Sequence, residues 1–168
     1  MENGFSGEIL GDAERPNTRL PSLGEIGLNN FAPYIMNRLI ARWNANLAEE
    51  LKTRDMTTAK MRALAVLSVS PSLTINELSV FAVMEQSTMS RTVDSLEEQG
   101  LISRKPRAGD MRVRDVAITE EGRALFDVFW PTMYEGLRQM FQDIDDDEYR
   151  AFLTTLHKIL RNIRKHDL

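Results

Sequence analysis

Apolar residues recur every three or four positions over long parts of the chain, which is the period of an amphipathic helix. The clearest series predicts a helix from about Pro33 to Lys52. Its apolar positions are Ile35, Leu39, Trp43, Leu47 and Leu51. The same period, interrupted by capping residues, prolines and glycines, predicts five more helices, at about 57–69, 75–82, 85–99, 120–144 and 145–165.

Before the helix at 120–144 the pattern changes from a helical period to alternation. The segments "LISRK" and "RVRDVAI" alternate apolar and polar residues, which is typical of strands. The stretch "PRAGDM" between them predicts the loose tip of a hairpin. Upstream, "TINE" at residues 74–77 is a capping box that begins the short helix. Gly100 is expected to end the next helix in the left-handed conformation.

This order of elements is that of a winged helix-turn-helix domain with long helices added at both ends. The fold class is therefore mostly α, with a small hairpin (α+β). We expect a flexible arm at 1–28, a DNA-binding domain at 57–119, and dimerisation helices at 29–56 and 120–168. The added helices carry more apolar surface than one small wing domain could cover, which predicts a homodimer.

Composition excludes several kinds of chemistry. The 168 residues include no cysteine and two histidines, which excludes disulfides and thiolate catalysis and leaves few ligands for zinc. The acidic run "DIDDDE" is interpreted as a helix start, because calcium-loop spacing is absent. Neither a P-loop nor a hydrolase or dinucleotide motif occurs, so we expect no enzyme activity, cofactor or metal. Without an apolar run of roughly 18 residues, the chain is expected to be cytoplasmic and to avoid membranes.

Positive charge gathers on the hairpin, although the chain as a whole carries −4. Residues 103–114 hold five cations against one anion. The preceding helix has a narrow apolar stripe and a polar first part, which leaves that part free to contact a ligand. Such a helix suits the major groove of DNA, and a basic hairpin tip suits the adjacent minor groove. The candidate DNA contacts are Gln86, Ser87, Thr88, Ser90, Arg91, Arg107, Asp110, Arg112 and Arg114.

Two other interpretations of the hairpin stay open. Edge strands often carry charge simply to prevent pairing with other strands, so a basic hairpin by itself does not establish DNA binding. A winged helix can also serve as a scaffold that binds another protein and no DNA, since fold does not settle function. Salt distinguishes the two functions, because DNA binding weakens steeply with ionic strength.

Over roughly residues 30–165 the chain resembles the MarR family of bacterial transcriptional regulators. The segment "STMSRTVDSLEEQGLISR" is similar to the family's recognition helix and following strand. Asp110, Arg112, Ile118 and Thr119 match its wing signature D-x-R-x-x-x-x-x-L-T, with Ile in place of Leu, and "TEEG" follows. The resemblance implies a homodimeric regulator, expected to be a repressor, that binds double-stranded DNA. It also implies that Arg112 enters the minor groove and that Asp110 orients the wing. The N-terminal arm is longer than in most relatives.

The resemblance further implies a small effector, an aromatic acid or a phenol, in a cleft between the dimerisation helices and the winged domain. The shortage of cysteine and histidine also favours an organic signal over peroxide or zinc. The groups that could line such a cleft are Arg38, Arg42, Trp43 and Met61, with an arginine as the partner of a carboxylate. A packing role for Trp43 and Met61 remains the common alternative for these residue types.

Overall fold

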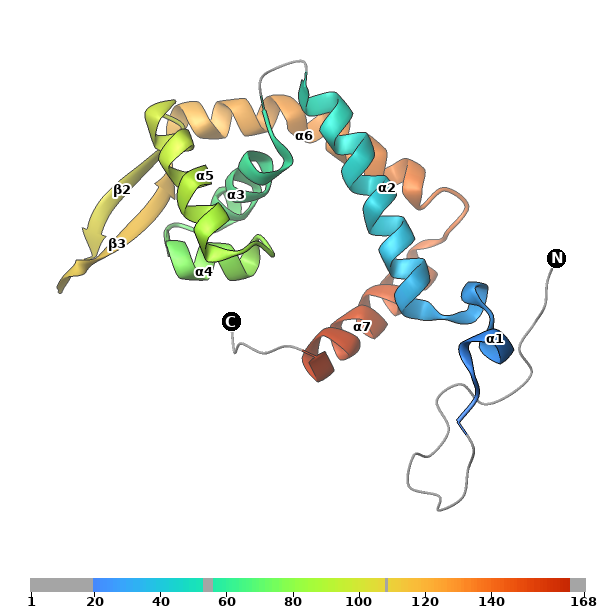
Figure 1. Cartoon of the computed structure of the whole chain (residues 1–168). Helices are drawn as coiled ribbons and strands as arrows, with labels where there is room; N and C mark the ends of the chain where they lie inside the picture. The colour runs from blue at the N-terminus through green and yellow to red at the C-terminus, as the bar shows by residue number, and fades with distance from the viewer. Residues whose placement is uncertain (1–19, 53–55, 108, 164–168) are drawn as a thin grey trace. The chain divides into compact units, whose positions relative to one another are not determined.

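The computed structural model describes residues 20–52, 56–107 and 109–163 (Figure 1). By contacts within the chain it divides into two compact units, Met1–Glu50 and Leu51–Leu168. Its helices are α1 (Leu23–Ile26), the 3-10 helix η1 (Leu28–Asn30), α2 (Ala32–Lys52), α3 (Thr58–Val69), α4 (Ile75–Phe81), α5 (Gln86–Glu98), α6 (Glu120–Met140) and α7 (Asp146–Ile163). Its strands are β1 (Leu73–Thr74), β2 (Ile102–Arg107) and β3 (Asp110–Ile118). Among the described helices, none combines the length and apolar character needed to cross a bilayer.

The first unit contains short helical turns where the sequence suggested an irregular arm. The side chains and backbones of Ser22 and Glu25 form a capping box, in which Glu25 Oε2 accepts from the Ser22 amide at 2.7 Å. This box begins α1, and the 3-10 turn η1 follows. The rest of the predicted arm, residues 1–19, lies outside the described part of the chain. The predicted long helix is confirmed as α2.

The core of the second unit lies among α3, α4, α5 and the sheet, with the first part of α6 packed against α3. The predicted apolar stripe of α5 is confirmed, because Met89, Val93 and Leu96 are fully buried. Opposite them lie other fully buried side chains, namely Met61, Leu64, Leu67, Leu78 and Val116. One face of α5 is therefore buried in the core of the second unit.

The sheet has three antiparallel strands in the order β1-β3-β2. The two-residue strand β1 was not predicted; it pairs Leu73 with Val116 and Thr74 with Asp115. The hairpin tip is also shorter than expected, because Pro106 and Arg107 belong to β2 and β3 begins at Asp110. The predicted "PRAGDM" loop is therefore wrong: strand pairing continues into it.

The register of the hairpin changes at its tip. From Ile102 to Pro106 the β2–β3 pairing is regular, and Pro106 lies opposite Arg114. Arg107 then pairs with Asp110, whereas the regular register would place Val113 opposite it. Three extra residues of β3, at 111–113, therefore bulge from the ladder. Arg112, which the sequence singled out for the minor groove, lies in this bulge.

Side-chain hydrogen bonds fix the starts of α4 and α6. The predicted capping box is confirmed: the Glu77 amide donates to Thr74 Oγ1 at 3.2 Å, and Glu77 Oε2 accepts from the Thr74 amide at 2.7 Å. Thr119 caps α6 and also donates from its hydroxyl to the Gly100 carbonyl at 2.8 Å. Gly100 has the predicted left-handed conformation, with φ +71°. Together these elements form a winged helix-turn-helix, with α5 as its second helix and β2–β3 as its wing.

Candidate nucleic-acid interface

The first two turns of α5 present a polar surface. Gln86, Ser87, Thr88 and Arg91 are exposed, and Ser90 is half-buried. The N-cap residue of this helix, Glu85, makes no capping hydrogen bond with its side chain. Short hydroxyls, an amide and a guanidinium at an open helix start can donate to both phosphates and base edges. The structure therefore places the α5 residues that the sequence selected together on the first two turns of one helix.

Asp110 organises the backbone at the wing tip. Its Oδ1 accepts a hydrogen bond from the Arg112 amide at 3.0 Å, a local turn that fixes the chain at the start of the bulge. The side chains of Arg112 and Arg114 are exposed. Among the described residues, neither guanidinium lies within salt-bridge distance of a carboxylate. These two cations are therefore available to a phosphate.

Arg104 instead joins the wing to α5. Side chains on a strand alternate between its two faces, so Arg104 lies on the face of the buried residues Ile102 and Val116. Its Nε donates to Glu97 Oε2 at 2.8 Å, its Nη1 donates to Asp94 Oδ1 at 2.7 Å, and its Nη2 also contacts Glu97. The hydrogen bonds from Arg104 lower the pKa of Glu97 below its usual value. One guanidinium of the wing thereby contacts two acidic side chains of α5.

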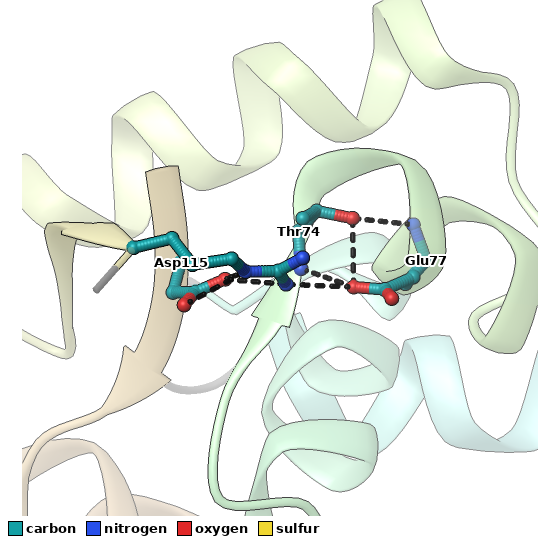
Figure 2. Close-up of polar contacts among 4 residues, drawn as sticks. Thr74, Glu77 and Asp115 are labelled. Carbon is teal, nitrogen blue, oxygen red and sulfur yellow. Dashed lines mark hydrogen bonds and ion pairs between the residues drawn. The ribbon is translucent and has the colours of Figure 1, made fainter. Parts of the chain in front are cut away.

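Arg107 lies on the opposite face of the sheet and is held by Asp115. Its Nε donates to both carboxylate oxygens of Asp115, at 3.0 and 3.2 Å, and its Nη2 donates to Oδ1 at 2.7 Å. The same Nη2 is 3.6 Å from Glu77 Oε2, the oxygen that closes the capping box of α4. Figure 2 shows Glu77 bound to Thr74 on one side of this cluster and Asp115 on the other. One guanidinium thus connects β2, β3 and the start of α4.

The surroundings of Glu77 favour its ionised form. Hydrogen bonds from the backbone and hydroxyl of Thr74 are the main reason that the pKa of Glu77 lies below its usual value. The positive charge of Arg107 lowers this pKa further, whereas the nearby charge of Asp115 raises it. For Arg107, the hydrogen bonds to Asp115 raise the pKa of the guanidinium. Both shifts favour the charged forms of Glu77 and Arg107.

The ion pairs that Arg104 and Arg107 form with acidic side chains were not predicted from the sequence. The excess of five cations over one anion in residues 103–114 does not show which of these cations are paired. The acids that pair with them come from α5, β3 and α4, outside the counted segment or beyond its end. A signal was present in the spacing of Asp94 and Glu97, which lie three residues apart and so on one helix face.

The candidate effector residues fall in different units. Arg38, Arg42 and Trp43 lie on α2 in the first unit, and the Arg38 guanidinium is 5.8 Å from the centroid of the Tyr34 ring. Met61 lies on α3 in the second unit, where it is only 1% exposed and belongs to the core. A cleft lined by all four residues therefore stays a prediction. Within the described residues there is no cluster of three or more carboxylates and histidines that could hold a metal ion.

Comparison with known proteins places this geometry in a family. A MarR family model matches residues 54–112. A MarR family transcriptional regulator from Silicibacter pomeroyi is 47% identical, with a TM-score of 0.84 over 88% of this chain and 100% of that chain. The chain belongs to the MarR family.

Two further relatives agree with this assignment. A second MarR family regulator from Silicibacter pomeroyi DSS is 32% identical, with a TM-score of 0.79 over 90% of this chain and 100% of that chain. The HTH-type transcriptional repressor IacR of Pseudomonas putida is 30% identical over 143 residues, which are 85% of this chain and 86% of that protein. The chain is therefore a transcriptional regulator of the MarR family and not an enzyme.

Proposed function

We propose that this protein is a repressor that binds a pseudo-palindromic DNA operator as a homodimer and is released by a small aromatic acid or phenol. The observation that carries the proposal is the combination of the polar start of α5 with the exposed wing arginines Arg112 and Arg114, all within one compact unit. A half-site would be read by residues 86–91 in a major groove, and Arg112 would enter the neighbouring minor groove.

Exposed apolar side chains support the homodimer. Helix α7 has no buried residue, although a regular apolar stripe runs along it. Within this stripe Leu160 is 56% exposed and Ile163 is 68% exposed. On α6, Trp130 and Tyr134 are also half-exposed and lie with their ring centroids 5.9 Å apart. A second copy of the chain would remove such surface from water.

The effector is supported by two proteins that share the fold at 20–22% identity. DNA binding by BpsR of Bordetella bronchiseptica is regulated by 6-hydroxynicotinic acid, and CouR of Rhodococcus jostii RHA1 has been crystallised with p-coumaroyl-CoA. For this chain we propose an aromatic acid whose carboxylate is bound by Arg38 or Arg42. Such a ligand would release DNA only to the extent that it prefers the non-binding conformation.

DNA binding is tested by sequencing the genomic fragments that the purified protein retains and then measuring affinity for the recovered site. Replacing Arg112 with Ala should weaken binding by roughly 1–3 kcal/mol if the side chain sits in a minor groove. Arg138→Ala is the matched control, because it removes an exposed cation of α6, outside the DNA-binding region. Equal losses in the two variants would contradict the wing assignment. If no genomic fragment were retained even at low salt, the protein scaffold would be favoured instead.

The effector is tested on the same operator. An aromatic acid should weaken DNA binding, and Arg38→Ala or Arg42→Ala should reduce that effect while leaving affinity without ligand nearly unchanged. Calorimetry with a broad panel of aromatic acids measures binding directly. If none binds and none changes operator affinity, the small-molecule proposal fails while DNA binding stands.

A further inference from the structure

We infer that Arg107 is a positioning residue, which orients the wing tip through Asp115 and Glu77 and does not contact phosphate itself. The inference rests on the proposed function, because it assigns a role within DNA binding. It separates Arg107 from Arg112 and Arg114, with which the sequence grouped it. Three observations carry it: the geometry of the ion pair, its place in the hairpin register, and the charge of the cluster.

The Arg107 guanidinium contacts two carboxylates, those of Asp115 and Glu77. Its Nε and Nη2 form a two-pronged contact with the Asp115 carboxylate, the arrangement in which a guanidinium is held most firmly. The Nη2 atom also lies 3.6 Å from Glu77 Oε2. The side chain is 41% exposed, so its donors are partly shielded from an incoming phosphate as well as occupied.

The register explains why this contact controls the tip. Arg107 is the residue at which the regular pairing of β2 with β3 breaks. Beyond Pro106, the bulge at residues 111–113 has lost the ladder hydrogen bonds that fix direction in a regular hairpin. The ion pair crosses this break, since it connects the last residue of β2 to Asp115 in the regular part of β3. It therefore substitutes for the missing ladder contacts and limits how the tip carrying Arg112 can swing.

The charge of the cluster opposes a direct phosphate contact. One guanidinium and two carboxylates, from Arg107, Asp115 and Glu77, carry a net charge of −1. A phosphate that approached Arg107 would be repelled by two carboxylates, both within ion-pair distance of that guanidinium. Arg112 and Arg114 have no carboxylate within salt-bridge distance among the described residues, although the charge of Arg114 helps to lower the pKa of Glu97. Arg107 is thus held between acids, whereas no salt bridge occupies the guanidinium groups of Arg112 and Arg114.

The test is the salt dependence of operator affinity for the full-length protein. Log affinity falls with log salt, and each lost phosphate contact reduces the steepness of this fall by about 0.9, hence by about 1.8 for a dimer. We expect Arg107→Gln to weaken affinity about tenfold with little change of slope. Arg114→Gln is the matched variant and should lower the slope. Because an exposed ion pair contributes at most about 1 kcal/mol to stability, Arg107→Gln should fold, which circular dichroism verifies.

A double-mutant cycle with Arg112 separates positioning from general weakening. If Arg107 acts by placing Arg112, then Arg107→Gln should have little further effect once Arg112→Ala is present. Two independent phosphate contacts would instead give additive losses. A reduced slope for Arg107→Gln together with additivity would overturn this inference alone. If the unmodified protein bound no duplex at any salt concentration, the proposed function would be overturned and this inference with it.

Discussion

Gly122, at the start of α6, is predicted to be the residue of the wing domain least tolerant of a methyl group. A Cβ atom at this position would lie 2.0 Å from the Leu101 carbonyl oxygen and 3.0 Å from Ile118 Cγ1. The carbonyl is not free to retreat, because it accepts a hydrogen bond from the Thr119 amide at 3.1 Å. Gly122→Ala must therefore push α6 away from the strand β2 that Leu101 precedes.

The expected cost follows from what that displacement breaks. Overpacking a buried site costs about 1–3 kcal/mol, and weakening the Thr119–Leu101 hydrogen bond adds about 1 kcal/mol. Alanine's better helix propensity returns about 1 kcal/mol, so a net loss of about 1–3 kcal/mol is expected. For a chain of this length that corresponds to a fall of roughly 2–12 °C in Tm.

Urea and thermal unfolding followed by circular dichroism measure this loss. Gly24→Ala in α1 is the matched control, since the nearest atom to its Cβ would be 3.9 Å away. The control should stay within about 1 kcal/mol of the unmodified protein. A Gly122→Ala variant that unfolds at the same urea concentration as the unmodified protein would refute the steric reasoning.

Three further predictions concern stability. Val83 is a β-branched residue with φ +54°, so its backbone is strained in the turn between α4 and α5, and its side chain is 82% exposed. Val83→Asn should therefore raise the free energy of unfolding in urea by about 1 kcal/mol. Val69→Asn, at another exposed position, should not raise it. Thr74→Val removes the hydroxyl that accepts from the Glu77 amide and should cost about 1 kcal/mol in the same assay; an unchanged midpoint would contradict the capping role. Because folding lowers the pKa of Glu77 from 4.5, its ionised form contributes stability above that pH, and this contribution is lost as pH falls through the lowered value. The unmodified protein should therefore have a higher free energy of unfolding in urea than Glu77→Gln at pH 6, and this difference should shrink below about pH 4.5. A difference that stays constant with pH would exclude the ionisation of Glu77 as its source.

Local signals in the sequence were sufficient for the helices of the winged helix-turn-helix. The capping box at Thr74, the cap at Thr119 and the left-handed Gly100 are each determined by a few neighbouring residues, and the structure confirms all three. The apolar stripe on α5 could also be predicted, because apolar residues that recur with the 3.6-residue period of a helix indicate which of its faces is buried. Prediction succeeded where the interacting residues are close along the chain.

Prediction failed where partners are distant in sequence. The strand β1 has only two residues, and it exists because β3, some forty residues later, offers Val116 and Asp115 as partners. The extension of β2 through Pro106 into the expected loop likewise depends on pairing with β3. No local pattern specifies such contacts, since they arise from the assembled sheet.

The same limit governs the candidate interface, because charge counted along a segment is not charge presented in space. Of the five cations of the hairpin, Arg104 and Arg107 are neutralised by acids from α5, β3 and α4. The other three cations, Lys105, Arg112 and Arg114, make no salt bridge within the described residues, so unpaired positive charge lies on β2 and at or next to the bulged tip. Positive charge gathered near the tip should favour insertion into one groove over lateral attachment to any phosphate. We therefore predict that the ion pairs beneath the tip influence the specificity of this wing without contacting DNA themselves.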